Sequence, residues 1–158
     1  MEHATASPEL SRTGLNRLAV SATNHCLTGC AIGEILGMFL ATAFGWGNAA
    51  SIALAVGLAY VFGFGLTARP LVKAGLAPGT VVSTALAADT LSITIMEVID
   101  NLTVVLVPGA MDAGVDDPLI YGSIAAGFTI AYPFAFLANR YMIARGKGHA
   151  LVHEHHGH

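Results

Sequence analysis

The stretch from Ala49 to Thr67, AASIALAVGLAYVFGFGLT, decides the fold class because it contains no charged side chain. About 20 helical residues cross the hydrocarbon core of a bilayer, so this stretch is long enough for one transmembrane helix. Three further apolar stretches run over Cys26–Gly45, Thr80–Val107 and Leu119–Ala138. The 158-residue chain is 54% hydrophobic and only 11% charged, a composition that excludes an ordinary soluble domain. We therefore predict an all-α polytopic membrane protein with four transmembrane helices.

The basic residues predict how these helices are oriented. They precede the first stretch, separate the second from the third, and follow the fourth: Arg12, Arg17, Arg69, Lys73, Arg140, Arg145 and Lys147. The positive-inside rule then places both termini in the cytoplasm. The expected organisation is an N-terminal tail over residues 1–24, which could form an interfacial helix, a four-helix domain over 25–145, and a His-rich tail over 146–158.

Four carboxyl groups lie inside the apolar stretches, and no basic side chain shares their depth. They belong to Glu34, Asp89, Glu97 and Asp100. A charged acid in hydrocarbon is costly, so such residues usually face the interior of a helix bundle and mark an ion or proton pathway. The compensating charge is expected to come from protons or from a bound cation.

The first apolar stretch carries a series of metal-ligand side chains. Cys26, Cys30 and Glu34 lie near one face of a helix, and His25 stands at the expected cytoplasmic end. Thiolate, imidazole and carboxylate groups all bind metals, and thiols favour soft or borderline ions, so copper or zinc is the expected ion. The alternative is that both cysteines are small buried residues that pack between helices.

Glycines repeat every four residues beside that series, at Gly29, Gly33 and Gly37. Small residues at this spacing let two helices approach closely within a membrane. The spacing fits a contact inside one chain as well as a homo-oligomer, and both interpretations stay open.

The third apolar stretch has one broad polar sector. On a helix, this sector holds Asp89, Thr90, Ser92, Thr94, Met96, Glu97, Asp100 and Asn101. Counting residues from the expected helix starts puts Glu34 and Asp89 at a similar depth. The sequence therefore predicts a metal path from His25, Cys26 and Cys30 through Glu34 and Asp89 to Met96, Glu97 and Asp100. The competing interpretation is a protonated hydrogen-bond network that only holds the helices together.

The C-terminal tail has a composition that captures metals. Its imidazoles belong to His149, His153, His155, His156 and His158. A cytoplasmic tail of this kind would lie beside the mouth formed by His25 and Cys26.

Two sequence blocks resemble a known family. The run from His25 to Glu34, HCLTGCAIGE, and the segments Ala88–Ile93 and Met96-Glu97 are similar to the bacterial membrane family called domain of unknown function 4396. The resemblance implies a four-helix membrane architecture, and we expect the protein in a bacterial inner membrane. It supplies no activity, so the function has to be argued from the residues.

These observations favour a membrane protein that binds and transports a transition-metal cation, with protons exchanged through the same acids. The expected partners are the lipid bilayer, the cation and protons, and a second copy of the chain is the partner if the glycines serve a homo-oligomer. No basic patch predicts nucleic-acid binding. One alternative is a non-transporting membrane assembly or interaction subunit with a protonated polar core. Another is a membrane metalloenzyme, although the spans lack the Glu-x-x-His motif of di-iron bundles and no catalytic residue is assigned.

Overall fold

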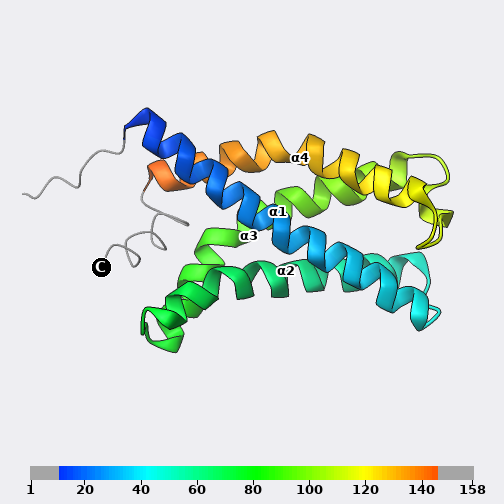
Figure 1. Cartoon of the computed structure of the whole chain (residues 1–158), viewed down its shortest axis with the longest axis horizontal. Coiled ribbons are helices and arrows are strands. Elements are labelled where there is room, and N and C mark those ends of the chain that lie inside the picture. The colour runs from blue at the N-terminus through cyan, green and yellow to red at the C-terminus, as the bar shows by residue number, and fades with distance from the viewer. Residues whose placement is uncertain (1–10, 146–158) are drawn as a thin grey trace, which may run out of the picture.

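The computed structural model describes residues 11–145, which form four long helices joined by short loops (Figure 1). The elements are α1 (Arg12–Ala43), α2 (Asn48–Lys73), α3 (Pro78–Leu106), the 3-10 turn η1 (Ala110–Asp112) and α4 (Pro118–Ala144). No strand occurs within this part of the chain. All four helices are long and apolar enough to cross a membrane. The prediction of an all-α membrane protein with four helices is thus confirmed.

The first helix begins earlier than the apolar stretch alone indicates. The Ser11 side chain caps it by accepting a hydrogen bond from the Gly14 backbone N–H at 3.1 Å. From Arg12 the helix continues without a break to Ala43. Residues 12–25 are therefore continuous with the first membrane span. At the other end of α1, Gly45 adopts a φ of 67°, a left-handed conformation that glycine tolerates and that turns the chain into α2.

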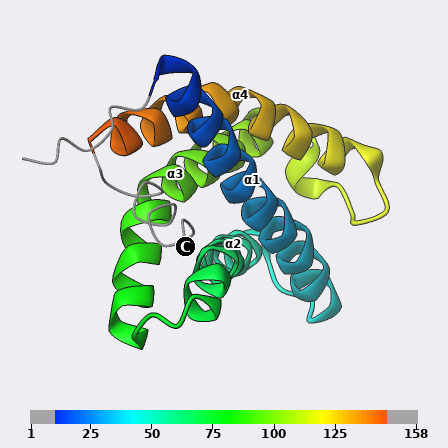
Figure 2. The same ribbon diagram turned by 60° about the vertical axis from the view of Figure 1, so that its left-hand side comes forward.

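Consecutive helices run in opposite directions, so α1 and α3 are parallel (Figures 1 and 2). Each of them packs against both α2 and α4, and they also contact each other across the bundle. The two helices that carry the buried acids therefore meet at its centre. The α1–α2 and α3–α4 connections lie at the same end (Figure 1). We call it the acidic-loop end because the α3–α4 connection holds Asp112, Asp116 and Asp117.

A seam of small residues joins α1 to α2. A Cβ atom added to Gly29 would lie 2.7 Å from the Gly63 Cα atom, and one added to Gly37 would lie 2.5 Å from the Ala55 Cα atom. Between these positions, a Cβ on Gly33 would collide with the backbone of Ala59. The glycines predicted to allow a close helix contact are thus used within one chain, where backbone packs on backbone.

The outer faces of the helices are apolar. Val61, Leu102 and Leu137 are each more than half exposed on α2, α3 and α4 respectively. Side chains of this kind suit contact with lipid tails, and the polar residues gather on the inner faces instead.

Candidate functional site

All four acids of the apolar stretches are buried in the bundle. Asp89 and Asp100 are 0% exposed, and Glu97 and Glu34 are also buried. None of the Lys and Arg residues in the described part of the chain is buried with them. The structure therefore gathers the acids inside the protein, away from the lipid-facing surfaces and from basic side chains.

One cluster forms around Asp89. The Cys26 Sγ atom donates towards Asp89 Oδ1 at 3.7 Å, which connects α1 to α3. Thr67 of α2 lies beside the same carboxyl group, and Ser92 lies beside the Cys26 thiol. His25, which precedes Cys26 in α1, is half-buried. We call Cys26, Thr67, Asp89 and Ser92 the Asp89 cluster.

Asn139 of α4 ties this cluster to the rest of the bundle. Its Nδ2 atom donates to the Ser92 Oγ atom at 3.0 Å and to the Thr23 Oγ1 atom at 3.1 Å. All three side chains are buried. The amide therefore joins α4, α3 and α1, while Thr67 adds α2, so all four helices contribute a polar group at this level.

A second cluster contains three acids, Glu34, Glu97 and Asp100, together with Cys30. We call the three acids the acid triad. Glu34 of α1 lies close enough to Glu97 and Asp100 of α3 for their charges to interact. Cys30 is near the same two α3 acids. The Asn101 Nδ2 atom donates to Glu97 Oε2 at 3.4 Å. The three acids are thus buried within electrostatic range of one another, so a charge on one carboxyl group disfavours a charge on the others.

Asp100 is held tightly against α4. A Cβ added to Gly127 would lie 2.8 Å from the Asp100 Cα atom and would collide with its Oδ1 atom. No group in the described part of the chain donates a hydrogen bond to either carboxyl oxygen of Asp100. A buried acceptor without a donor is costly, so a proton or a cation at this carboxyl group would stabilise it.

The two clusters follow from the parallel arrangement of α1 and α3. Residue numbers increase by eight in both helices, from Cys26 to Glu34 and from Asp89 to Glu97, which corresponds to about 12 Å along a helix axis. Glu34 therefore lies level with Glu97, and Asp89 lies level with Cys26. The expectation that Glu34 and Asp89 share one depth is wrong, because α1 begins at Arg12 and not near Cys26.

The polar sector of α3 is narrower than its sequence indicates. Thr90 and Thr94 are exposed, and each hydroxyl donates to a carbonyl of its own helix, at Leu86 and Thr90. Thr94 also contacts the Tyr60 hydroxyl of α2. The centre of the buried face instead includes Ile93, which packs on Gly63. A threonine can satisfy its hydroxyl within its own helix, and it need not face the core.

The predicted metal ligands do not converge on one centre. They divide between the two clusters, with Met96 fully buried in the core. Within residues 11–145, no three His, Cys, Asp or Glu side chains form a group that could hold a metal ion. Both cysteines are free thiols. The tail histidines, His149 to His158, lie outside the described residues.

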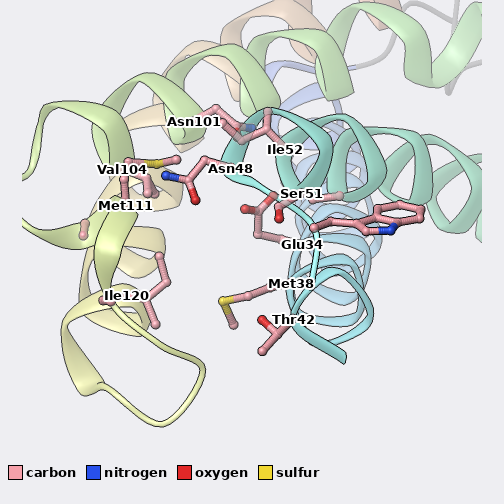
Figure 3. Close-up of a pocket in the computed structure, with 14 residues that line it drawn as sticks. Glu34, Met38, Thr42, Asn48, Ser51, Ile52, Asn101, Val104, Met111 and Ile120 are labelled. Carbon is pink, nitrogen blue, oxygen red and sulfur yellow. The ribbon is translucent and has the colours of Figure 1, made fainter. Parts of the chain in front are cut away.

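A cavity of about 130 Å³ opens beside the acid triad at the acidic-loop end (Figure 3). Glu34 lines it together with Met38, Asn48, Asn101 and Met111. Figure 3 shows that these side chains come from α1, α2, α3 and the η1 segment. Glu34 is therefore the member of the triad that connects the buried acids to an open space.

Residues 16–148 match the model of a family described as domain of unknown function (DUF4396). The chain belongs to this family. The resemblance carried by the HCLTGCAIGE block is confirmed. No curated protein and no solved structure matches this DUF4396 chain.

Four site residues of the DUF4396 protein were not predicted as such from its sequence. Thr67, Asn139 and Gly127 come from the two helices that contain no acid, and Met111 comes from η1, between α3 and α4. Asn139 gives the only signal of the four, because an amide close to the end of an apolar stretch is costly to bury without partners. The other three become visible only when the helices are packed together.

Proposed function

We propose that this DUF4396 protein binds a transition-metal cation in its buried acidic core and transports it across the membrane. The observation that carries the proposal is the grouping of Glu34, Glu97 and Asp100 with no buried Lys or Arg in the described chain. Two or more charged carboxylates in one buried volume repel each other strongly. The group therefore needs positive charge from protons or from a metal ion.

In the proposed cycle, the cation and protons compete for the same carboxyl oxygens. Glu34 meets the ion first because it lines the cavity. Glu97 and Asp100 lie behind it in the triad, and Cys30 provides a soft donor next to them. The Asp89 cluster, about 12 Å farther along the bundle, supplies a second position with Cys26. A short-lived ion passing between positions does not require one preformed metal centre.

The orientation of this path follows from the positive-inside rule. Arg12, Arg17, Arg69 and Lys73 lie at the end opposite the acidic loops, so that end would face the cytoplasm of a bacterial inner membrane, together with both termini. The cavity would then face the outside. All the acids and both thiols belong to one chain, and the proposal requires no second copy.

Ion flux into proteoliposomes tests the proposal. Full-length protein would be compared with empty vesicles for Cu(I), Zn(II), K⁺ and protons. We expect flux of a transition metal that Glu34→Gln and Asp100→Asn abolish and that Asp116→Asn leaves unchanged, because Asp116 is exposed in the acidic loop. Folded protein that moves none of these ions would overturn the proposal. Movement of K⁺ or protons alone would overturn the choice of a metal as cargo.

A non-transporting assembly subunit is a second candidate, and the Asn139 network favours it. Hydrogen bonds from Asn139 to Thr23 and Ser92 are what a protonated core that holds helices together would use. Such a subunit would give no ion-dependent flux, and Glu34→Gln would leave its assembly with partner proteins intact. The flux assay therefore separates the two candidates.

A further inference from the structure

We propose that the cavity at the acidic-loop end is a port for a soft monovalent cation, Cu(I) or Ag(I). Its donors are the thioethers of Met38 and Met111 and the carboxylate of Glu34. This inference rests on the proposed function and names the class of cation that the site admits.

The three donors come from different parts of the fold and meet at one cavity. Met38 follows Glu34 by four residues in α1, so the two side chains lie on the same face of the helix. Met111 comes from η1, on the other side of the cavity. Figure 3 shows Glu34 and both methionine side chains around the same space. Both methionines are partly buried against the hydrophobic core, which limits how far their sulfur atoms can move.

Glu34 supplies the independent indication of a ligand. Its side chain is only 8% exposed, and no described group donates a hydrogen bond to its Oε2 atom. A buried carboxyl oxygen without a donor is destabilising unless something positive or protic reaches it. The cavity of about 130 Å³ has room for an ion with several water molecules.

The chemistry of the donors selects the cation. Thioethers are neutral, soft ligands that suit Cu(I) and bind hard cations poorly. The Glu34 carboxylate supplies the negative charge that a monovalent cation needs beside these two neutral ligands. No His or Cys is among the described residues that line the cavity, so the usual nitrogen and sulfur ligands of Zn(II) are missing there. The structural alternative is that both methionines only fill space, which Met does readily.

Methionine methyl NMR tests this port directly. Full-length protein labelled with ¹³C in its methionine methyl groups would be titrated to saturation with Ag(I), which is redox-inert, and resonances would be assigned with single Met→Leu variants. We expect Ag(I) to shift the Met38 and Met111 signals together, and Zn(II) to leave both in place. Met142, in the last turns of α4, is the matched control and should not respond. Unchanged Met38 and Met111 signals at saturation would overturn the port.

Two further measurements keep this result separate from the proposed function. Glu34→Gln should weaken the Ag(I) response of both methionines about tenfold, because it removes the charge that faces the ion. The double variant Met38→Leu and Met111→Leu should lose Ag(I) flux while Met142→Leu keeps it. Metal flux with unmoved methionine signals would reject the port alone. Shifted signals without any flux would reject transport and leave the binding site established.

Discussion

The Sγ atom of Cys26 lies 3.7 Å from the Oδ1 atom of Asp89, so α1 and α3 meet through a thiol and a carboxyl group at the centre of the bundle. Both residues are 0% exposed. Cys26 thus faces Asp89 at this level, and eight residues farther along both helices Glu34 lies near Glu97.

Burial predicts that neither cysteine reacts readily with a polar reagent. Cys26 and Cys30 are both fully buried, and thiol chemistry requires access to the thiolate. We expect a charged maleimide to label neither residue in the folded protein and both after denaturation, as measured by mass spectrometry. Thr13→Cys, at an exposed position in the first turn of α1, is the positive control. Rapid labelling of Cys30 in the folded state would show that the core is open to water.

The close packing of α1 on α2 at Gly33 predicts that one added methyl group strongly lowers the stability of the protein. In Gly33→Ala the new Cβ would collide with the Ala59 backbone, so we expect a loss of about 1–3 kcal/mol in the free energy of unfolding, or more. Gly57→Ala is the control, because nothing lies within 4 Å of a Cβ there. Unfolding in detergent, followed by circular dichroism, measures both variants. Equal stability of the two would mean that α1 and α2 are not packed as described.

Removal of the Asn139 amide should destabilise the bundle. Asn139→Ala leaves the Ser92 and Thr23 hydroxyls without their shared donor, which predicts a loss of about 1–3 kcal/mol. The control is Asn16→Ala, which removes an exposed hydrogen bond from Arg140 Nε and should change stability much less. Thermal unfolding of both variants tests the difference. A milder effect of Asn139→Ala than of Asn16→Ala would contradict the buried network.

The close packing of Gly127 on Asp100 predicts that a larger residue at position 127 impairs transport. Gly127→Ala places a methyl group against the Asp100 carboxyl group and 2.8 Å from its Cα atom, so both the carboxyl group and the packing of α3 on α4 must shift. Under the proposed function, metal flux should fall strongly in this variant, whereas Gly122→Ala, with open space around its Cβ, should transport normally. Proteoliposome flux per folded protein is the measurement. Normal flux in Gly127→Ala would remove Asp100 from the path.

The number of helices and the burial of the acids could be predicted from the sequence for a simple physical reason. Lipid penalises polar side chains so strongly that an apolar stretch interrupted by Asp89 or Glu97 has to turn those residues inward. The same reasoning predicted Cys26 and Cys30 on the inner face of α1, where the structure has them.

The level at which the acids pair could not be predicted in the same way. Apolar composition marks where lipid begins, but α1 begins at Arg12, where Ser11 caps it, so Glu34 lies farther from the start of its helix than the apolar stretch indicates. Gly127 and Thr67 lie in helices with no acidic pattern. Their role depends on which neighbour they face, and that is a property of packing that periodicity alone does not contain.

The close backbone contact at Gly33 and Ala59 also limits how this protein can move. Backbone packs on backbone there, so a shift of one helix along the other would bring side chains into a contact that has room only for glycine. We therefore expect α1 and α2 to stay together in any opening of the acidic interior, which would separate α1 from α3. The thiol–carboxyl contact between Cys26 and Asp89 joins α1 to α3, so such a movement would break it.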